Sequence, residues 1–321
     1  MFFIPILDRT TNQLGTLAQN KLEIILRGYE RKSYPNSDLL GTHLPVNLLA
    51  YNFCKTQRDV YLYITGEVLP ESWDRYQGRV VHYFYEIIYN KIREIITTSS
   101  IDKINIFDSL LTERDSLKQN AIKKYSGVYN KVKGMYGTGD LKKKNDDLAE
   151  NLDKIFRFEV SLCSSLVNFE ISRLYNQTGG DSLLQKAAAL HVGQQFAASP
   201  LGFSDPVSPD FIYKQAVGDV KTGEWQEYYQ HTIAAYALAV ENHLREDVNC
   251  GVILHVNLDQ SRKVPICEKT EFINIDDTIR RKFLIIRDQK LYIAKYQNDP
   301  GLPEDDSGCV GCNHHEKCWG V

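Results

Sequence analysis

Two short stretches decide the fold class: Ser208-Pro209-Asp210-Phe211-Ile212-Tyr213-Lys214 and Gly218-Asp219-Val220-Lys221-Thr222-Gly223. Each contains an apolar run of strand length bounded by turn residues, so together they predict two neighbouring strands. Side chains alternate along a strand, which places Asp219 and Lys221 on one face and Val220 on the other. A hairpin between the two strands would bring Asp210 to the same edge.

The chemistry of this edge follows from its two carboxylates. Asp210 and Asp219 can share a hard divalent cation, Mg²⁺ or Mn²⁺, through oxygen ligands. Such a cation lowers the pKa of bound water and offsets charge on phosphoryl oxygens. Lys221, held within reach, would orient that water or stabilise the transition state. The alternative is an exposed ion pair, the ordinary role of a D-x-K triplet in a surface hairpin.

The residues that follow this hairpin extend the pattern. Residues 227–244, EYYQHTIAAYALAVENHL, place Ile233, Tyr236 and Val240 on one helical face, and CGVILHVNL at 250–258 predicts a buried strand. The order strand, strand, helix, strand indicates an α/β fold with a sheet flanked by helices. Residues 276–297 predict another helix capped by Asp276 or Asp277, with two strands around residues 287–289 as the alternative.

The chain before the hairpin is predominantly helical. Residues 44–63 predict two helices with a break at residues 52–55, and a stronger helix opens at Gly78. Helical character continues to about residue 175, interrupted by KGMYGTGD at 133–140, and changes after Gly179-Gly180. Lysines surround that interruption: Lys131, Lys133, Lys142, Lys143 and Lys144. They predict either a solvated helix end or a basic element that contacts phosphates.

His82 lies in the helix that opens at Gly78, as the last residue of a G-x-x-x-H pattern. Neutral imidazole is a good ligand for Mn²⁺ and is tolerated at Mg²⁺ sites. Alone, His82 is an ordinary core or surface histidine. Followed in order by P-D, D-x-K and an amphipathic helix, it becomes a third candidate ligand beside Asp210 and Asp219.

Three of the seven cysteines fall in the last 13 residues, as Cys309-x2-Cys312-x5-Cys318. In a cytosolic chain such a cluster indicates metal more often than a disulfide. A zinc or iron–sulphur site needs a fourth ligand, for which His314, His315 and the distant Cys54 are candidates. The spacing leaves both metals open. The other three cysteines are interpreted as inert buried residues: Cys163, Cys250 and Cys267.

Composition excludes several classes of protein. The 321 residues carry 38 Lys+Arg against 41 Asp+Glu, a net charge of −3, which excludes nucleic-acid binding by bulk charge but permits a local basic groove. No apolar run is long enough for a transmembrane helix. The start, MFFIPILDRTTNQL, has no basic segment followed by an apolar core, as a secretory signal would. We therefore expect a cytoplasmic protein without membrane association.

These motifs together resemble the CRISPR-associated "Cas Four" exonucleases, a RecB-like nuclease family that binds a four-iron, four-sulphur cluster. The similarity is closest to the longer archaeal variant found with subtype I-A CRISPR loci. It spans residues 26 to 318 and is weakest from about 95 to 180. The segments that carry it, besides the cysteine tail, are Leu26-Arg27-Gly28-Tyr29, residues 54–62, residues 218–223, residues 231–241 and Asp299-Pro300-Gly301.

The resemblance implies a fold and a set of roles. The fold would be α/β, a RecB-like PD-(D/E)xK core with a mixed sheet, a helical N-terminal region and a C-terminal cysteine-rich tail. His82, Asp210, Asp219 and the Val220 carbonyl would bind the catalytic Mn²⁺ or Mg²⁺, and Lys221 would be the motif lysine. Cys54, Cys309, Cys312 and Cys318 would hold the 4Fe-4S cluster. The boundaries would be 1–75 and 76–180 for the two helical regions, 181–298 for the nuclease core and 299–321 for the tail.

Two features depart from the family pattern. The family usually has Q-x3-Y on the helix after the lysine, whereas Thr232 stands four residues before Tyr236 here, with Gln230 and His231 nearby. Gln230, His231 and Tyr236 are therefore candidate DNA contacts only. The second acidic ligand is Asp219 where the family has Glu, which is one methylene longer.

The family degrades DNA, favours single-stranded ends and trims spacer precursors for the CRISPR integrase, so the resemblance predicts a DNA exonuclease of CRISPR adaptation. The expected partners are DNA and the integrase proteins, and a homo-oligomer is open. The alternative is a weakly catalytic or non-catalytic module that binds DNA and the integrase during spacer selection. A zinc-binding nucleic-acid protein is a third option.

Overall fold

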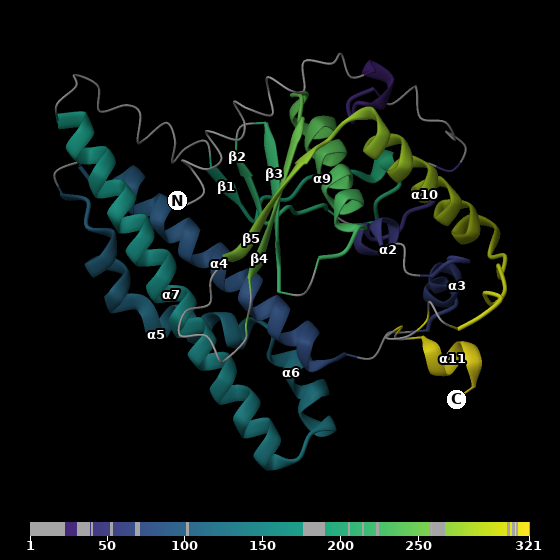
Figure 1. The fold of residues 1–321 in the computed structure, drawn as a ribbon, viewed down its shortest axis with the longest axis horizontal. Helices are drawn as coiled ribbons and strands as arrows, with labels where there is room; N and C mark the ends of the chain where they lie inside the picture. Colours follow the sequence, from purple (N-terminus) through teal and green to yellow (C-terminus); the bar gives the residue numbers. More distant parts are fainter. Residues whose placement is uncertain are drawn as a thin grey trace.

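A mixed five-stranded sheet lies at the centre of the computed structural model (Figure 1). Its strands follow the order β1-β2-β3-β4-β5, and they are Leu190–Val192, Phe211–Tyr213, Ala216–Lys221, Cys250–Val256 and Cys267–Asn274. Strands β3 and β4 are parallel, whereas the other neighbours pair antiparallel. The parallel pair is connected through helix α9, Tyr229–Leu244. The predicted α/β class and the order strand, strand, helix, strand are confirmed.

The structure describes residues 23–30, 39, 41–51, 54–67, 71–100, 103–175, 190–204, 206–213, 215–222, 225–256, 258, 267–306, 309, 312 and 314–320. Some predictions fall elsewhere. The exact place of the break near Asn52-Phe53, the change at Gly179-Gly180 and the positions Lys214 and Gly223 lie outside the described residues. The same holds for the side chain of Cys267, whereas Cys163 and Cys250 are buried as expected.

One face of the sheet is covered by a helical layer, which Figure 1 shows on the side of β1. Its helices are α4 (Trp73–Thr98), α5 (Ile106–Lys124), α6 (Ser126–Val132) and α7 (Thr138–Tyr175), with a short 3-10 turn at Lys133–Met135. Val80, Phe84 and Ile88 of α4 share one apolar cluster with Val220 and Leu254 of the sheet. This packing holds α4, and with it His82, against the strand that carries Asp219.

The opposite face of the sheet packs on α9, α10 (Asp277–Tyr296) and the short α2 (Val46–Ala50). Val217 and Ile253 contribute to this second cluster, and each lies an odd number of strand positions from the residue of its own strand that faces the first, Val220 or Leu254. The alternation is what a sheet buried on both faces requires. Helices α3 (Arg58–Ile64) and α11 (His315–Trp319) lie near each other beyond α10 (Figure 1).

The carboxylate of Glu241 fixes one end of α9. It is fully buried and accepts hydrogen bonds from the guanidinium of Arg27 at 2.7 Å, the Arg280 guanidinium at 2.9 Å and the amides of Gly28 and Val248 at 2.7 and 3.1 Å. A buried carboxylate is tolerated only when it is paired in this way. The bonds tie α9 to α10 and to the turn Ile24–Leu26.

The start of helix α10 agrees with the sequence prediction, whereas the start of helix α4 does not. Helix α10 begins after Asp276, whose carboxylate accepts from the Ile279 amide at 2.9 Å, so the alternative of two strands near residues 287–289 is wrong. Helix α4 starts at Trp73 rather than at Gly78, because the Ser72 hydroxyl caps it by accepting from the Arg75 amide at 3.3 Å.

Strands β1 and β5 were not predicted. In the described part of the chain, no helix is long and apolar enough to cross a membrane.

Candidate functional site

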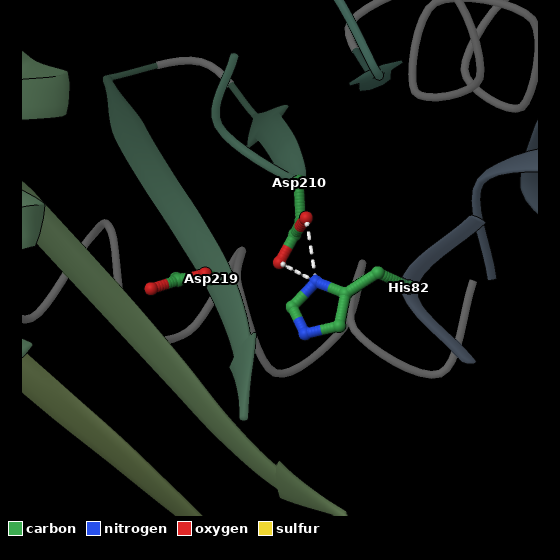
Figure 2. A group of neighbouring side chains, drawn as sticks. All are labelled: His82, Asp210 and Asp219. Atoms are coloured by element: carbon green, nitrogen blue, oxygen red, sulfur yellow. Dashed lines mark hydrogen bonds and ion pairs between the residues drawn. The ribbon is translucent and has the colours of Figure 1, made fainter. Parts of the chain in front are cut away.

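Three side chains from separate elements meet near the end of β3, the central strand of the sheet. Among the residues that the structure describes, His82, Asp210 and Asp219 are the three His, Cys, Asp or Glu residues whose ligand atoms all lie within 4.8 Å of one another. His82 comes from α4, Asp210 precedes β2, and Asp219 lies in β3. Figure 2 shows the imidazole turned toward the Asp210 carboxylate, with Asp219 nearby. All three were predicted from the sequence as metal ligands.

Asp210 holds this group together. One of its carboxylate oxygens accepts a hydrogen bond from the Val220 amide at 2.6 Å, across the β2–β3 hairpin. The same carboxylate lies 3.0 Å from Nδ1 of His82 (Figure 2). The hairpin therefore does what the sequence predicted, bringing Asp210 beside the strand that carries Asp219.

Lys221 extends from the same strand face as Asp219. Its Nζ lies 2.7 Å from a carboxylate oxygen of Asp219 and 5.1 Å from the centre of the Tyr229 ring. Both members of this pair are largely buried. The alternative of an exposed surface ion pair is therefore wrong, because the pair lies in the interior beside a third titratable group.

The environment shifts the two carboxyl groups in opposite directions. Burial raises the pKa of Asp219 above its usual range, and the negative charge of Asp210 adds to this, although Lys221 opposes it. Burial acts the same way on Asp210, but the charge and hydrogen bond of His82, with the Val220 amide, hold the pKa of Asp210 below its usual range. Two neighbouring buried carboxylates do not both ionise readily, so Asp219 retains a proton to higher pH than an ordinary aspartate.

The two basic groups of the site favour their charged forms. Burial alone would lower the pKa of His82, but the Asp210 carboxylate outweighs it and the pKa is raised. For Lys221, burial is likewise outweighed by Asp219 and by the phenol groups of Tyr51 and Tyr236, so its pKa lies well above its usual range. Lys221 is thus an ammonium ion at neutral pH.

A cavity of about 200 Å³ adjoins Lys221 on the side of α9. Tyr236, one of the candidate DNA contacts, lines it, and so does Thr232, which replaces the glutamine expected from the family pattern. His231 is buried against the backbone of Ala50. Contacts of Gln230, His231 and Tyr236 with DNA stay predictions.

Three polar residues that line this cavity were not predicted as site residues from the sequence: Asn47, Tyr51 and Ser208. Ser208 directly precedes the Pro-Asp pair, so its proximity to the site follows from the hairpin. Asn47 and Tyr51 reach the cavity only because α2 packs on α9. No motif in residues 45–51 signals that position.

All four cysteines proposed as cluster ligands line a second, small cavity: Cys54, Cys309, Cys312 and Cys318. The Cys54 thiol accepts from the Arg58 amide at 3.3 Å, and the amide of Cys312 donates to the Cys309 carbonyl at 2.9 Å. His314 and His315, the rival ligands, line the same cavity. In the described part of the chain, the four thiols include no group of three whose sulphur atoms lie within 4.8 Å of one another.

Polar contacts fasten the cysteine-rich tail to the region of α3. The Arg58 guanidinium donates to both Asp299 carboxylate oxygens, with 2.9 Å to the nearest atoms, and the Thr56 hydroxyl donates to the Gly301 carbonyl at 3.0 Å. Lys317 of α11 lies 2.6 Å from Glu67. The tail is therefore held beside Cys54 by contacts that do not involve the thiols.

Comparison with known proteins places the chain in a family. A family model described as "CRISPR-associated exonuclease Csa1" matches residues 1–320. The chain is also 24% identical over 288 residues to the CRISPR-associated exonuclease Csa1 of Saccharolobus solfataricus, which is 89% of this chain and 89% of that protein. The resemblance to the longer archaeal variant is confirmed. The chain belongs to the family of the CRISPR-associated exonuclease Csa1.

Proposed function

We propose that this protein is an Mg²⁺- or Mn²⁺-dependent DNA exonuclease that trims single-stranded ends of spacer precursors for the CRISPR integrase. The observation that carries the proposal is the meeting of His82, Asp210 and Asp219 within 4.8 Å, with Lys221 at 2.7 Å from Asp219. The family description supports an exonuclease associated with CRISPR. A hairpin followed by a parallel crossover around these residues supports a RecB-like PD-(D/E)xK core.

The donor set at this site fits a hard divalent cation. Two carboxylates and one imidazole offer oxygen and nitrogen ligands within a single coordination sphere, and the Val220 carbonyl would be a further one. When bound, the cation would supply a water of lowered pKa and offset charge on the phosphoryl group.

The residues of the chain have separate tasks in this reaction. Asp210 keeps His82 oriented through its contact with Nδ1, and the Val220 amide keeps Asp210 itself in place. Lys221 holds a permanent positive charge beside Asp219. A fixed ammonium group in a buried site stabilises the negative charge that develops on the phosphoryl oxygens.

The cysteine cavity supports the proposal of a four-iron, four-sulphur cluster. Its lining contains four cysteines, Cys54, Cys309, Cys312 and Cys318, and four thiolates are the usual ligand set of such a cluster. His314 and His315 line the same cavity and would be the alternative ligands of a zinc ion. When bound, the cluster would join the region of α3 to the C-terminal tail.

The test of this function is cleavage of labelled single-stranded DNA with Mn²⁺ by anaerobically purified protein. We expect Asp219→Asn to lower the cleavage rate by at least about 10²-fold, because a neutral amide is a poor metal ligand of nearly the same shape. Asp115→Asn, an exposed site on α5, is the matched control and should cleave normally. Equal cleavage by Asp219→Asn and the wild type would refute the assignment.

The wild-type protein also tests the alternative role. DNA and integrase binding without cleavage, under conditions in which the Mn²⁺ site is filled, would replace the exonuclease by a non-catalytic module for spacer selection. Duplex DNA with and without a single-stranded overhang then tests the preference for single-stranded ends.

A further inference from the structure

The cavity beside Lys221 shares that lysine with the candidate metal site, whereas its other lining residues have no task in the proposed metal chemistry. It is enclosed by the start of α2, residues 206–208, the end of β3 and helix α9. Lys221 belongs both to this cavity and to the cluster of Asp219 and His82, since its Nζ lies 2.7 Å from Asp219. A group bound in the cavity would therefore lie one side chain away from the candidate metal ligands.

Thr232 supplies the observation that points to a ligand. Its side chain is only 2% exposed, and among the residues that the structure describes its Oγ1 has no hydrogen-bond partner. Burying a hydroxyl without a partner is unfavourable, and a valine would fill the same space without that penalty. A threonine that lines a cavity with an unsatisfied hydroxyl is explained when a bound group completes its hydrogen bonding.

The other lining residues indicate the charge of that group. Lys221 is the charged side chain of the lining, and no carboxylate is among the described residues that line the cavity. Asn47, Ser208 and Tyr236 add an amide and two hydroxyl donors. Several donors around one ammonium group favour an anion, and charge-assisted hydrogen bonds to phosphate are among the strong ones.

The size of the cavity limits what enters. Its volume of about 200 Å³ is below the roughly 300–1,000 Å³ of pockets for drug-sized ligands. A phosphate group with part of its sugar fits such a space, and a base pair does not. We propose that this cavity binds the terminal phosphate of a single DNA strand, so that the strand end is recognised beside the candidate metal ligands.

This inference deepens the proposed function, on which it rests for the substrate class. Either end of a DNA strand can carry the phosphate, so the probes are three fluorescent oligonucleotides of one sequence, with a 5′-phosphate, a 3′-phosphate or no terminal phosphate. Binding is measured by anisotropy in buffer with chelator, where no cleavage occurs. We expect one phosphorylated end to bind about tenfold or more tightly than the others. Equal affinity for all three would overturn the inference.

Thr232→Val is the variant that separates recognition from folding. It removes the hydroxyl at nearly constant shape, so we expect loss of most of the preference with an unchanged or higher melting temperature. Thr112→Val, at an exposed threonine of α5, is the matched control and should keep the preference. Ser208→Ala removes a second hydroxyl donor from the lining. Because Ser208 is exposed, its replacement should not affect folding, and we expect it to weaken the preference for the phosphorylated end.

The outcomes distinguish this inference from the exonuclease proposal. If the protein cleaves DNA with Mn²⁺ but Thr232→Val and Ser208→Ala both keep the wild-type preference, the cavity assignment fails and the exonuclease stands. If the preference depends on Thr232 but the wild type does not cleave, strand-end binding stands and the exonuclease proposal fails.

Discussion

Lys221 lies between two chemical environments. On one side its ammonium group contacts the Asp219 carboxylate, and on the other it faces a cavity lined by Thr232 and Tyr236. Asp219 is buried and shares the site with a second carboxylate, whereas the cavity lining that the structure describes is free of acids. The ammonium group of Lys221 can therefore act both on a phosphoryl group that reacts beside Asp219 and on an anionic group bound in the cavity.

Replacing that charge should separate metal binding from cleavage. We expect Lys221→Met to lower the cleavage rate on the order of 10²–10³-fold, the usual loss when one group that stabilises transition-state charge is removed. Mn²⁺ should still bind, because lysine is not a ligand in the proposed site. Electron paramagnetic resonance titration with Mn²⁺ and a cleavage assay measure the two effects. Loss of Mn²⁺ from this variant would contradict the role given to Lys221, and Lys103→Met, at an exposed lysine outside the basic element, is the control.

The raised pKa values of Asp219 and His82 predict that Mn²⁺ affinity depends on pH. Both groups must lose their protons to ligate a cation, and both hold them more tightly than usual in the metal-free protein. Affinity should therefore fall as the pH is lowered and reach a plateau when it is raised. Calorimetric titration between about pH 5 and pH 8 measures this. Asp219→Asn should bind weakly with a shallower dependence, and a flat wild-type profile would contradict the prediction.

At the scale of single elements, a strong hydrophobic pattern was enough to predict a helix or a buried strand. A short strand that depends on its neighbour in the sheet could not be predicted. Helix α10 has a long amphipathic pattern, α9 is a long, mostly apolar helix that is buried on nearly every side, and β4 is a continuous apolar run. Strand β1 has only three residues and exists because it pairs with β2, which no local pattern reveals. The first turn of α4 could have been found, since Ser72 directly before Trp73-Asp74 is an N-cap signal.

The candidate site divides in the same way. His82, Asp210 and Asp219 could be predicted because their residue types follow a known order along the chain. Asn47 and Tyr51 could not, because α2 reaches the cavity through its packing on α9 rather than through any pattern of its own. The candidate metal ligands could therefore be predicted from their residue types and order, whereas residues that reach the cavity through tertiary packing could not.

The lysines at the start of α7 differ in their surroundings. Lys144 lies over two aromatic rings, with its Nζ 4.9 Å from the Tyr136 centre and 5.6 Å from the Trp73 centre, whereas Lys142 and Lys143 are exposed. Lys144→Ala should therefore lower the free energy of unfolding by about 0.5–1 kcal/mol, the usual strength of an exposed cation–π contact, in urea denaturation.

Lys142→Ala with Lys143→Ala should leave stability unchanged and tests the basic element alone. If these lysines contact phosphates, the slope of affinity against salt decreases by about 0.7 for each lost contact with a single strand. An unchanged slope supports the solvated helix end instead. A triple substitution that includes Lys144 would mix the two effects.

At the scale of the whole molecule, the cysteine cavity brings together parts of the chain that are 255 residues apart, from Cys54 to Cys309. We expect Cys54→Ser to lose iron and lower the melting temperature together, because metal–thiolate bonds at a structural site contribute on the order of 10 kcal/mol. Changing His314 and His315 to Ala should leave the iron content unchanged. Metal analysis of anaerobically purified protein, with absorption near 400 nm, measures both variants.

Zinc would reverse these results. The protein would then be colourless, the histidine pair would be needed for metal and Cys54 would not. Stoichiometric zinc without iron in the wild type would therefore exclude the iron–sulphur cluster, while the match of the chain to its family would stand.

The separation of the cysteines along the chain has a consequence for biosynthesis. A ribosome that adds about 5–20 residues per second needs roughly 10 to 50 s to proceed from Cys54 to Cys309. During that interval the thiol of Cys54 has left the ribosome and the other three lining cysteines do not yet exist. Loading of the proposed cluster would therefore have to follow translation, and of the four thiols Cys54 would be exposed to oxidants for the longest time.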